Sequence, residues 1–173
     1  MLLLSLSLAF MIAACDQIIQ NEIDEAEERS DHVTYGYYKL DIPDTGEREV
    51  YKNVKIGVYD PIERIEINYS ITNPGIFGAE VEISVELPDY PDLDRETVVN
   101  KLVPAGSWVK GTIEDVESDL LSYVINDCDF FCDWTTPEEY VIRVWFKAID
   151  GPPGLKAEFK IVVDDTNSAN ANK

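Results

Sequence analysis

Apolar and polar residues alternate along much of this chain, as they do in β-strands that bury one face and expose the other. Gly and Pro turns separate the alternating runs, and only residues 117–126 have a short helical pattern. Many short strands without alternating long helices favour an antiparallel sandwich over a parallel α/β sheet. Strands are predicted at residues 33–40, 50–59, 65–72, 79–87, 96–103, 107–113, 140–149 and 155–163. We therefore predict an all-β fold, an antiparallel β-sandwich of about seven to nine strands.

Two neighbouring runs predict a hairpin. Residues 65–72 place Ile or Tyr at every second position, and residues 79–87 alternate small or branched apolar residues with glutamate and serine. Between them, Thr72-Asn73-Pro74-Gly75 fits a type II turn, because Pro presets the first central position and Gly supplies the positive φ of the second. The exposed face of this hairpin is predicted to be mostly acidic.

The same turns carry a resemblance to a known kind of module. Thr72-Asn73-Pro74-Gly75 follows one predicted strand, and Leu102-Val103-Pro104-Ala105-Gly106-Ser107 leads into another. In this arrangement residues 65–163 resemble the bacterial immunoglobulin-like modules related to cell adhesion. The resemblance implies an immunoglobulin-like β-sandwich. It implies little about function, because many sandwiches share such turns.

The chain begins with an apolar segment. Residues 2–14 are apolar apart from Ser5 and Ser7. This segment is too short for the ~20 residues of a membrane-spanning helix, but it fits the core of a signal peptide. The small residues Ala13 and Ala14 suit cleavage directly before Cys15. Residues 1–14 are therefore predicted to be a signal peptide.

Ile12-Ala13-Ala14-Cys15 resembles the lipobox of prokaryotic lipoproteins. In that family the cysteine is lipidated through its thiol and becomes the mature N-terminus. The resemblance thus implies a lipid anchor at Cys15 in a cell membrane, with the domain facing the periplasm or the exterior. Asp16 resembles the sorting residue that retains some Gram-negative lipoproteins at the inner membrane. The alternative is an ordinary secretory leader, with Cys15 an incidental residue of the mature chain.

The rest of the chain has the length of one domain. Residues 15–32 are predicted to be the lipidated cysteine and an acidic tether, which as a coil would reach about 20 to 25 Å. Residues 33–164 are predicted to form the β-sandwich domain. The polar residues 165–173 are predicted to form a disordered tail.

The composition is strongly acidic. Thirty-four Asp and Glu residues against fourteen Lys and Arg residues give a formal net charge of −20. Such a charge repels nucleic acid and is not drawn to anionic lipid, so no nucleic-acid partner is predicted. The charge has three functional interpretations, which are divalent-cation binding, a basic protein partner and adaptation to high salt. The alternative is an ordinary solvated surface without a specific role. A cation-dependent structural surface domain is therefore an alternative function.

Three cysteines are present, and Cys15 is assigned to the lipid. The remaining two, Cys128 and Cys132, are then predicted to form a disulfide, because disulfides persist in exported chains. In an extended strand their Cα atoms would lie ~13 Å apart, whereas a disulfide requires about 4.4 to 6.8 Å. The segment is therefore predicted to be a stapled loop or helical turn, and not a strand. Free thiols are one alternative.

A metal site is the other alternative for this segment. It would use the two thiolates with the neighbouring carboxylates Asp127, Asp129 and Asp133. Zinc prefers cysteine and histidine, but the only histidine, His32, lies in the tether region. The spacing also lacks the Gly and the bidentate Glu of an EF-hand loop. No metal and no cofactor are therefore predicted.

Aromatic residues lie within and beside the predicted Cys128–Cys132 disulfide loop. Phe130, Phe131 and Trp134 would suit recognition of a protein or a glycan if a rigid loop presented them. The alternative is that they cap one end of the core. Trp108 and Trp145 are assigned to the core or to sheet faces.

No enzyme motif stands out. His32 is the only histidine for a catalytic triad, and no Gly-rich phosphate loop precedes a helix. Paired carboxylates are uninformative among so many acids. The prediction is a non-catalytic envelope lipoprotein that binds an unidentified protein or polymer, with a carboxylate-based hydrolase as the further alternative.

Overall fold

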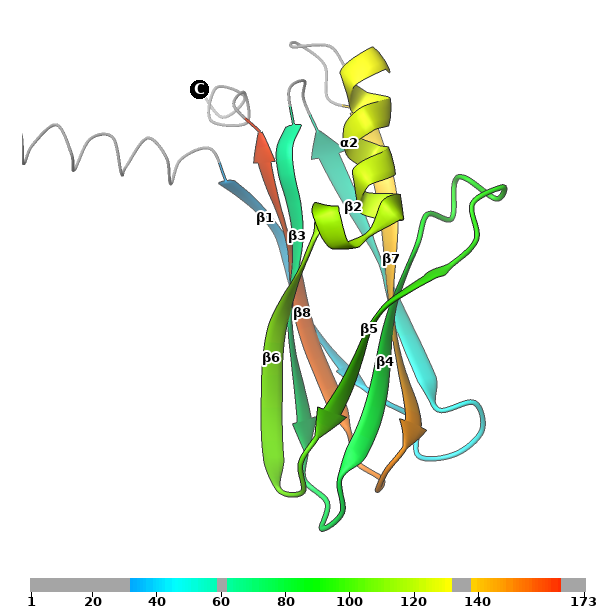
Figure 1. Ribbon diagram of the computed structural model, residues 1–173, viewed down its shortest axis with the longest axis vertical. Helices are drawn as coiled ribbons and strands as arrows, with labels where there is room; N and C mark the ends of the chain where they lie inside the picture. Colours follow the sequence, from blue (N-terminus) through cyan, green and yellow to red (C-terminus); the bar gives the residue numbers. More distant parts are fainter. Residues whose placement is uncertain (1–31, 59–61, 132–137, 166–173) are drawn as a thin grey trace, which may run out of the picture.

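The computed structural model describes residues 32–58, 62–131 and 138–165 (Figure 1). The strands are β1 (His32–Asp41), β2 (Glu49–Val58), β3 (Ile62–Asn73), β4 (Ala79–Glu86), β5 (Glu96–Val103), β6 (Ser107–Glu114), β7 (Glu138–Asp150) and β8 (Lys156–Asp165). A short 3-10 helix (Asp115–Glu117) precedes the helix α2 (Asp119–Phe131). Within these ranges, no helix has the length and apolar character that a membrane crossing requires.

The strands form two four-stranded sheets that pack face to face (Figure 1). Sheet I has the order β1-β8-β3-β6, and sheet II has the order β2-β7-β4-β5. Every pairing is antiparallel. All eight predicted strands are present, and their ends differ from the prediction by a few residues. The predicted all-β antiparallel sandwich is therefore confirmed.

The connections between the strands run mostly from one sheet to the other. Among the described strands, β4 and β5 are the one consecutive pair that also pairs within a sheet. Eight strands in this order form a double-sheet jelly roll. The order differs from that of immunoglobulin domains, in which the first, second, fifth and fourth strands share a sheet.

The predicted hairpin of β3 with β4 is wrong. β3 pairs with β6 and β8 in sheet I, whereas β4 pairs with β5 and β7 in sheet II. Alternation in the sequence tells which face of a strand is buried, but it does not tell which strand is the neighbour. Residues 74–78 therefore cross the sandwich, whose sheets pack about 10 Å apart.

Asn73 shapes this crossing, and the predicted type II turn is absent. Gly75 lies outside the left-handed region of backbone conformations. Instead, the buried Asn73 side chain accepts a hydrogen bond from the Gly75 N–H (2.9 Å) and donates to the carbonyls of Phe77 (2.8 Å) and Val103 (3.1 Å). Glycine is needed at position 75 because a Cβ there would lie 2.2 Å from the Pro152 ring.

The core consists of the inward-facing side chains of both sheets. Ile65, Ile67 and Ile71 on β3 face sheet II, and Phe146 on β7 packs on Phe159 of β8 with ring centroids 5.7 Å apart. Burying each such side chain stabilises the fold by roughly 1.5 to 3 kcal/mol. The sandwich is therefore held by apolar contact between the sheets, and polar residues are left to the two outer faces.

Helix α2 closes one end of the sandwich (Figure 1). Leu120, Leu121 and Val124 point inward and are buried. At its N-terminus, the Glu96 carboxylate of β5 accepts hydrogen bonds from the Ser118 hydroxyl (2.7 Å) and the backbone N–H of Asp119 (3.1 Å). An acidic side chain stabilises this end of a helix because it satisfies free N–H groups and opposes the helix dipole.

The helix continues five residues beyond the predicted 117–126 segment, as far as Phe131. Cys128 therefore lies in the last turn of a helix and not in a loop. As predicted, this segment is not a strand as far as Phe131. The predicted end of the helical pattern at residue 126 is wrong, because the helix continues to Phe131. The sequence has no Gly or Pro between Asn126 and Phe131 that would end the helix earlier.

Asp127 ties the helix to the sheets. The hydroxyls of Tyr90 and Tyr140 both donate to its carboxylate, each at 3.0 Å. Burial and the hydrogen bond to Asp127 raise the pKa of Tyr90 to about 12, and the same causes raise the pKa of Tyr140. This carboxylate, which the sequence offered as a metal ligand, is thus occupied as a structural acceptor.

The first prediction concerns Asn73. We expect Asn73→Ala to lower the free energy of unfolding by about 2 to 4 kcal/mol, because it leaves several buried backbone groups without partners. Urea denaturation followed by tryptophan fluorescence measures the change. Asn100→Ala is the control, since Asn100 is exposed on β5 and should shift stability by less than about 0.5 kcal/mol. Equal midpoints for the two variants would contradict the account of Asn73.

The second prediction concerns alkaline pH. The folded protein holds the Tyr90 proton to about pH 12, whereas the unfolded chain loses it near 10.0. The unfolded chain therefore binds fewer protons in this window, so stability is full below about pH 10 and falls as pH rises towards 12. Tyr90→Phe should flatten this decline in denaturation curves recorded at several pH values. Tyr51→Phe, which removes a phenol at a 47% exposed residue, should leave the decline unchanged.

Candidate functional site

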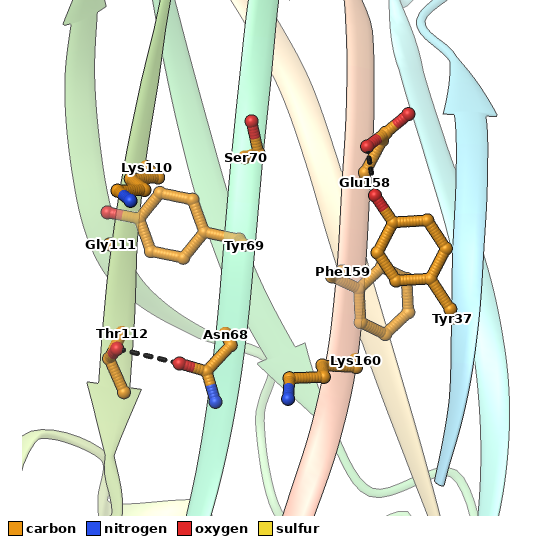
Figure 2. A pocket seen from close by; sticks show the side chains of 10 residues that line it. All are labelled: Tyr37, Asn68, Tyr69, Ser70, Lys110, Gly111, Thr112, Glu158, Phe159 and Lys160. Carbon is orange, nitrogen blue, oxygen red and sulfur yellow. Dashed lines mark hydrogen bonds between the residues drawn. The ribbon is translucent and has the colours of Figure 1, made fainter. Parts of the chain in front are cut away.

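A hollow of about 550 Å³ lies on the outer face of sheet I (Figure 2). Strands β1, β8, β3 and β6 all contribute to it. Its lining residues are Tyr37, Asn68, Tyr69, Ser70, Lys110, Gly111, Thr112, Glu158, Phe159 and Lys160. The volume lies within the range of about 300 to 1,000 Å³ that is typical of ligand sites.

The strand register brings the polar side chains of the hollow into rows. Asn68 on β3 lies between Lys160 on β8 and Thr112 on β6, and the Thr112 hydroxyl donates to the Asn68 carbonyl at 2.9 Å (Figure 2). In the next row, Ser70 lies between Glu158 and Lys110. Amide, hydroxyl, ammonium and carboxylate groups thus share one small surface.

Tyr37 stands at the β1 side of the hollow because of a β-bulge. The register of β1 against β8 shifts between Tyr35 and Tyr38, and Gly36 in the bulge has a φ of 66°. The extra residue lets Tyr35 and Tyr38 both turn inward while Tyr37 points outward and is 62% exposed. A bulge of this kind re-aims a side chain, and glycine makes the left-handed conformation accessible.

Trp108 lies on the same outer face at the opposite edge strand, β6. Its side chain is 58% exposed. The ammonium of Lys110, a lining residue of the hollow, lies 5.7 Å from the centre of a Trp108 ring. Sheet I therefore carries an exposed aromatic ring on each of its two edge strands, with the polar rows between them.

Tyr69 and Gly111 form part of the floor. The Tyr69 ring points towards β6 and lies beside Gly111 (Figure 2). A Cβ at position 111 would lie 2.5 Å from the Tyr69 hydroxyl, so glycine makes room for this ring. Burial raises the pKa of Tyr69, and the nearby Lys101 ammonium acts in the opposite direction.

Glu158 is the carboxylate of the hollow. It accepts hydrogen bonds from the Tyr37 hydroxyl and from the Lys39 ammonium, and these lower its pKa. The same carboxylate raises the pKa values of Tyr37 and Lys39. Glu158 is thus held ionised, with its oxygens directed at neighbouring donors.

This chemistry suits binding better than proton transfer. A carboxylic acid that protonates a leaving group needs a raised pKa and a second carboxylate opposite it. Among the ten lining residues of the hollow, Glu158 is the single carboxylate, and its pKa is lowered. The arrangement offers hydrogen-bond donors, acceptors and aromatic surface around a ligand.

None of the site residues predicted from the sequence is among the described residues that line the hollow. Cys15, Asp16, Cys132 and Trp134 fall outside the described residues. Cys128, Phe130 and Phe131 are described only as backbone positions of α2. The predicted disulfide, lipid anchor and aromatic loop therefore stay predictions. Across the described ranges, no three His, Cys, Asp or Glu side chains gather as a metal site would require.

Sequence reasoning missed the residues of the hollow. Gly36 within a tyrosine-rich strand was the available signal, because glycine in a strand interior often marks a bulge. The alternation of Trp108, Lys110 and Thr112 on the wet face of β6 was a second signal. Neither identifies the hollow without the register that brings β3, β6 and β8 together.

Comparisons with known proteins add no family. No protein-family model matches the sequence, and no curated protein matches it. Among solved structures, the xylan-binding module CBM15 is 12% identical over 76% of this chain and 94% of its own, with a TM-score of 0.40. The N-terminal endo-1,4-beta-D-xylanase 10B of Clostridium thermocellum, complexed with xylohexaose, is 10% identical over 79% of this chain, with a TM-score of 0.39.

A third structure, the Drosophila NLP-core, is 13% identical over 73% of this chain and 98% of its own, with a TM-score of 0.35. The present chain spans only 26% of the xylanase chain. Likenesses at these scores are too distant to carry an argument about function. The function has to be argued from the hollow itself.

Proposed function

We propose that this chain is a membrane-anchored envelope lipoprotein whose β-sandwich binds a polysaccharide at the hollow of sheet I. The observation that carries the proposal is the pair of exposed aromatic residues, Tyr37 and Trp108, on one outer face with hydrogen-bonding side chains between them. The site is a binding surface and performs no reaction in this proposal.

Sugars match this combination of groups. A sugar ring has an apolar C–H face, which packs on aromatic side chains, and a rim of hydroxyls, which need donors and acceptors. Asn68, Ser70 and Thr112 supply amide and hydroxyl groups, and Glu158 supplies a fixed acceptor. Tyr and Trp bury much area at little cost in side-chain entropy, so they suit an open face.

The spacing of the two aromatic residues favours a polymer over a single sugar. Trp108 pairs with Thr72, Thr72 pairs with Lys156, and Tyr37 lies beside Lys160, four residues further along β8. Three strand spacings across the sheet and four residues along it separate their Cα atoms by about 19 Å. A ligand that touches both rings must therefore be longer than one sugar ring.

The proposed anchor complements this surface. Lipid attached at Cys15 would hold the chain at a cell membrane, and the acidic residues 16–32 would link the lipid to the sandwich. A domain tethered in this way binds a nearby polymer at a raised effective concentration.

The third prediction tests the binding face. We expect Tyr37→Ala and Trp108→Ala each to weaken polysaccharide binding by roughly 5- to 150-fold, because stacking of a ring on an aromatic side chain contributes roughly 1 to 3 kcal/mol. Affinity electrophoresis against a panel of neutral and acidic plant and bacterial polysaccharides measures it. Tyr51→Ala is the matched control, since Tyr51 is 47% exposed but lies on sheet II. A folded protein that no polysaccharide of the panel retards would refute the proposal.

The fourth prediction tests the anchor. The full chain expressed in a bacterial host should partition into the detergent phase of a Triton X-114 extraction, and mass spectrometry should find acyl chains on Cys15. Cys15→Ser should move the protein to the aqueous phase and abolish the added mass. An aqueous, unlipidated wild-type protein would rule out the anchor while leaving the binding face untouched.

A further inference from the structure

The hollow of sheet I has an excess of positive charge on a strongly negative protein. The chain carries 34 acids against 14 bases. A second hollow of about 270 Å³ adjoins the first, and both share Glu158 in their lining. Among the lining residues of the two hollows, four lysines (Lys39, Lys110, Lys156 and Lys160) face two acids (Asp41 and Glu158).

Both of these acids already have basic partners. The Lys39 ammonium lies 3.0 Å from the Glu158 carboxylate, and the Lys156 ammonium lies 3.8 Å from the Asp41 carboxylate. The negative charge of the two hollows is thus neutralised locally. The charge that remains belongs to Lys110 and Lys160.

Lys110 and Lys160 have no carboxylate within 4.0 Å in the parts of the chain that the structure describes. They flank β3 on its two sides, since Lys110 pairs in register with Ser70 and Lys160 with Asn68. Two strand spacings and two residues place their Cα atoms about 12 Å apart. In a chain so rich in acids, two such lysines beside one hollow offer positive charge for negatively charged groups of a ligand.

From this charge pattern we infer that the ligand is an acidic polysaccharide whose uronic-acid carboxylates bind Lys110 and Lys160. The inference rests on the proposed function, and it adds the ligand class. Hydrogen bonds between an ammonium and a carboxylate are stronger than those between neutral groups. The aromatic residues at the two edges and the amide and hydroxyl groups between them distinguish this ligand from an acidic peptide, since they match sugar rings and hydroxyls.

The net charge of −20 does not oppose this inference at contact distance. At an ionic strength of about 0.1 M the Debye length is about 10 Å, so exposed charges beyond that distance are largely screened. The nearby lysines therefore dominate the electrostatic energy of the bound ligand. The distant acids mainly lower the rate at which a polyanion associates. Binding should weaken as salt is raised towards 1 M, where the Debye length falls to about 3 Å.

The fifth prediction compares polymers that differ only in charge. Affinity electrophoresis with the full chain, in EDTA, uses polygalacturonate against its methyl ester, and carboxymethyl cellulose against hydroxyethyl cellulose. We expect the charged member of at least one pair to bind at least about tenfold more tightly than the uncharged member. The double variant Lys110→Gln, Lys160→Gln should lose this preference, so that the ratio of its affinities for the two members falls towards one.

The matched control is Lys55→Gln, Lys147→Gln, which removes the same charge from the outer face of sheet II. It should keep the preference of the wild-type protein. Equal binding to both members of each pair would overturn the inference and leave the proposed function standing. Failure to bind any of the four polymers, with binding of another neutral polysaccharide through Tyr37 and Trp108, would also overturn it. Failure across the whole panel would overturn the proposed function as well.

Discussion

Apolar packing between the two sheets is the interaction on which the rest of the structure depends. Phe159 of β8 lies between Tyr38 of β1 and Phe146 of β7, with ring centroids 5.2 Å and 5.7 Å away. Because successive side chains of a strand point to opposite faces, a buried Phe159 directs its neighbours Glu158 and Lys160 outward. The polar rows of the hollow are therefore positioned by the core behind them, and not by loops.

The bulge in β1 is the local exception that completes the hollow. With Tyr35 inward, a regular strand would turn Tyr37 inward as well and Tyr38 outward. The extra residue at Gly36 restores the inward side chains on both sides of the bulge and leaves Tyr37 exposed. A Cβ at Gly36 would lie 2.3 Å from the Tyr38 ring, so the same glycine also allows that ring to pack closely. One residue thus serves both the core and the outer face.

The strands were predictable because burial imposes a two-residue period that the sequence records directly. Their partners were not, since the period is the same whichever strand lies alongside, and the predicted β3–β4 hairpin failed for that reason. The hollow was hidden for a related reason. Asn68, Lys110 and Lys160 each resemble ordinary exposed strand residues, and only the pairing of β3 with both β6 and β8 brings them together.

A second cluster of aromatic and charged side chains lies on the outer face of sheet II and can be compared with the hollow. Arg143 bonds both oxygens of Glu86 (3.0 and 3.2 Å) and lies 4.7 Å from the Tyr51 ring. Trp145 donates to Glu86 at 2.7 Å and lies under Arg95, whose guanidinium is 4.3 Å from its ring. Like the hollow, this cluster combines aromatic and basic groups on the outer face of a sheet.

Its groups, however, are engaged with one another. A ligand at Arg143 would have to displace a two-oxygen contact with Glu86, and a ligand at Trp145 would have to displace Arg95. Such a network stabilises the face of a sheet, because Arg143 is paired with Glu86 and Arg95 with Glu49. In the two adjoining hollows of sheet I, by contrast, Glu158 and Asp41 are paired with lysines, while Lys110 and Lys160 have no carboxylate within 4.0 Å among the described residues. Lysines without a nearby carboxylate, and not the number of aromatic or charged residues, are therefore the reason why we propose the ligand site on sheet I and not on sheet II.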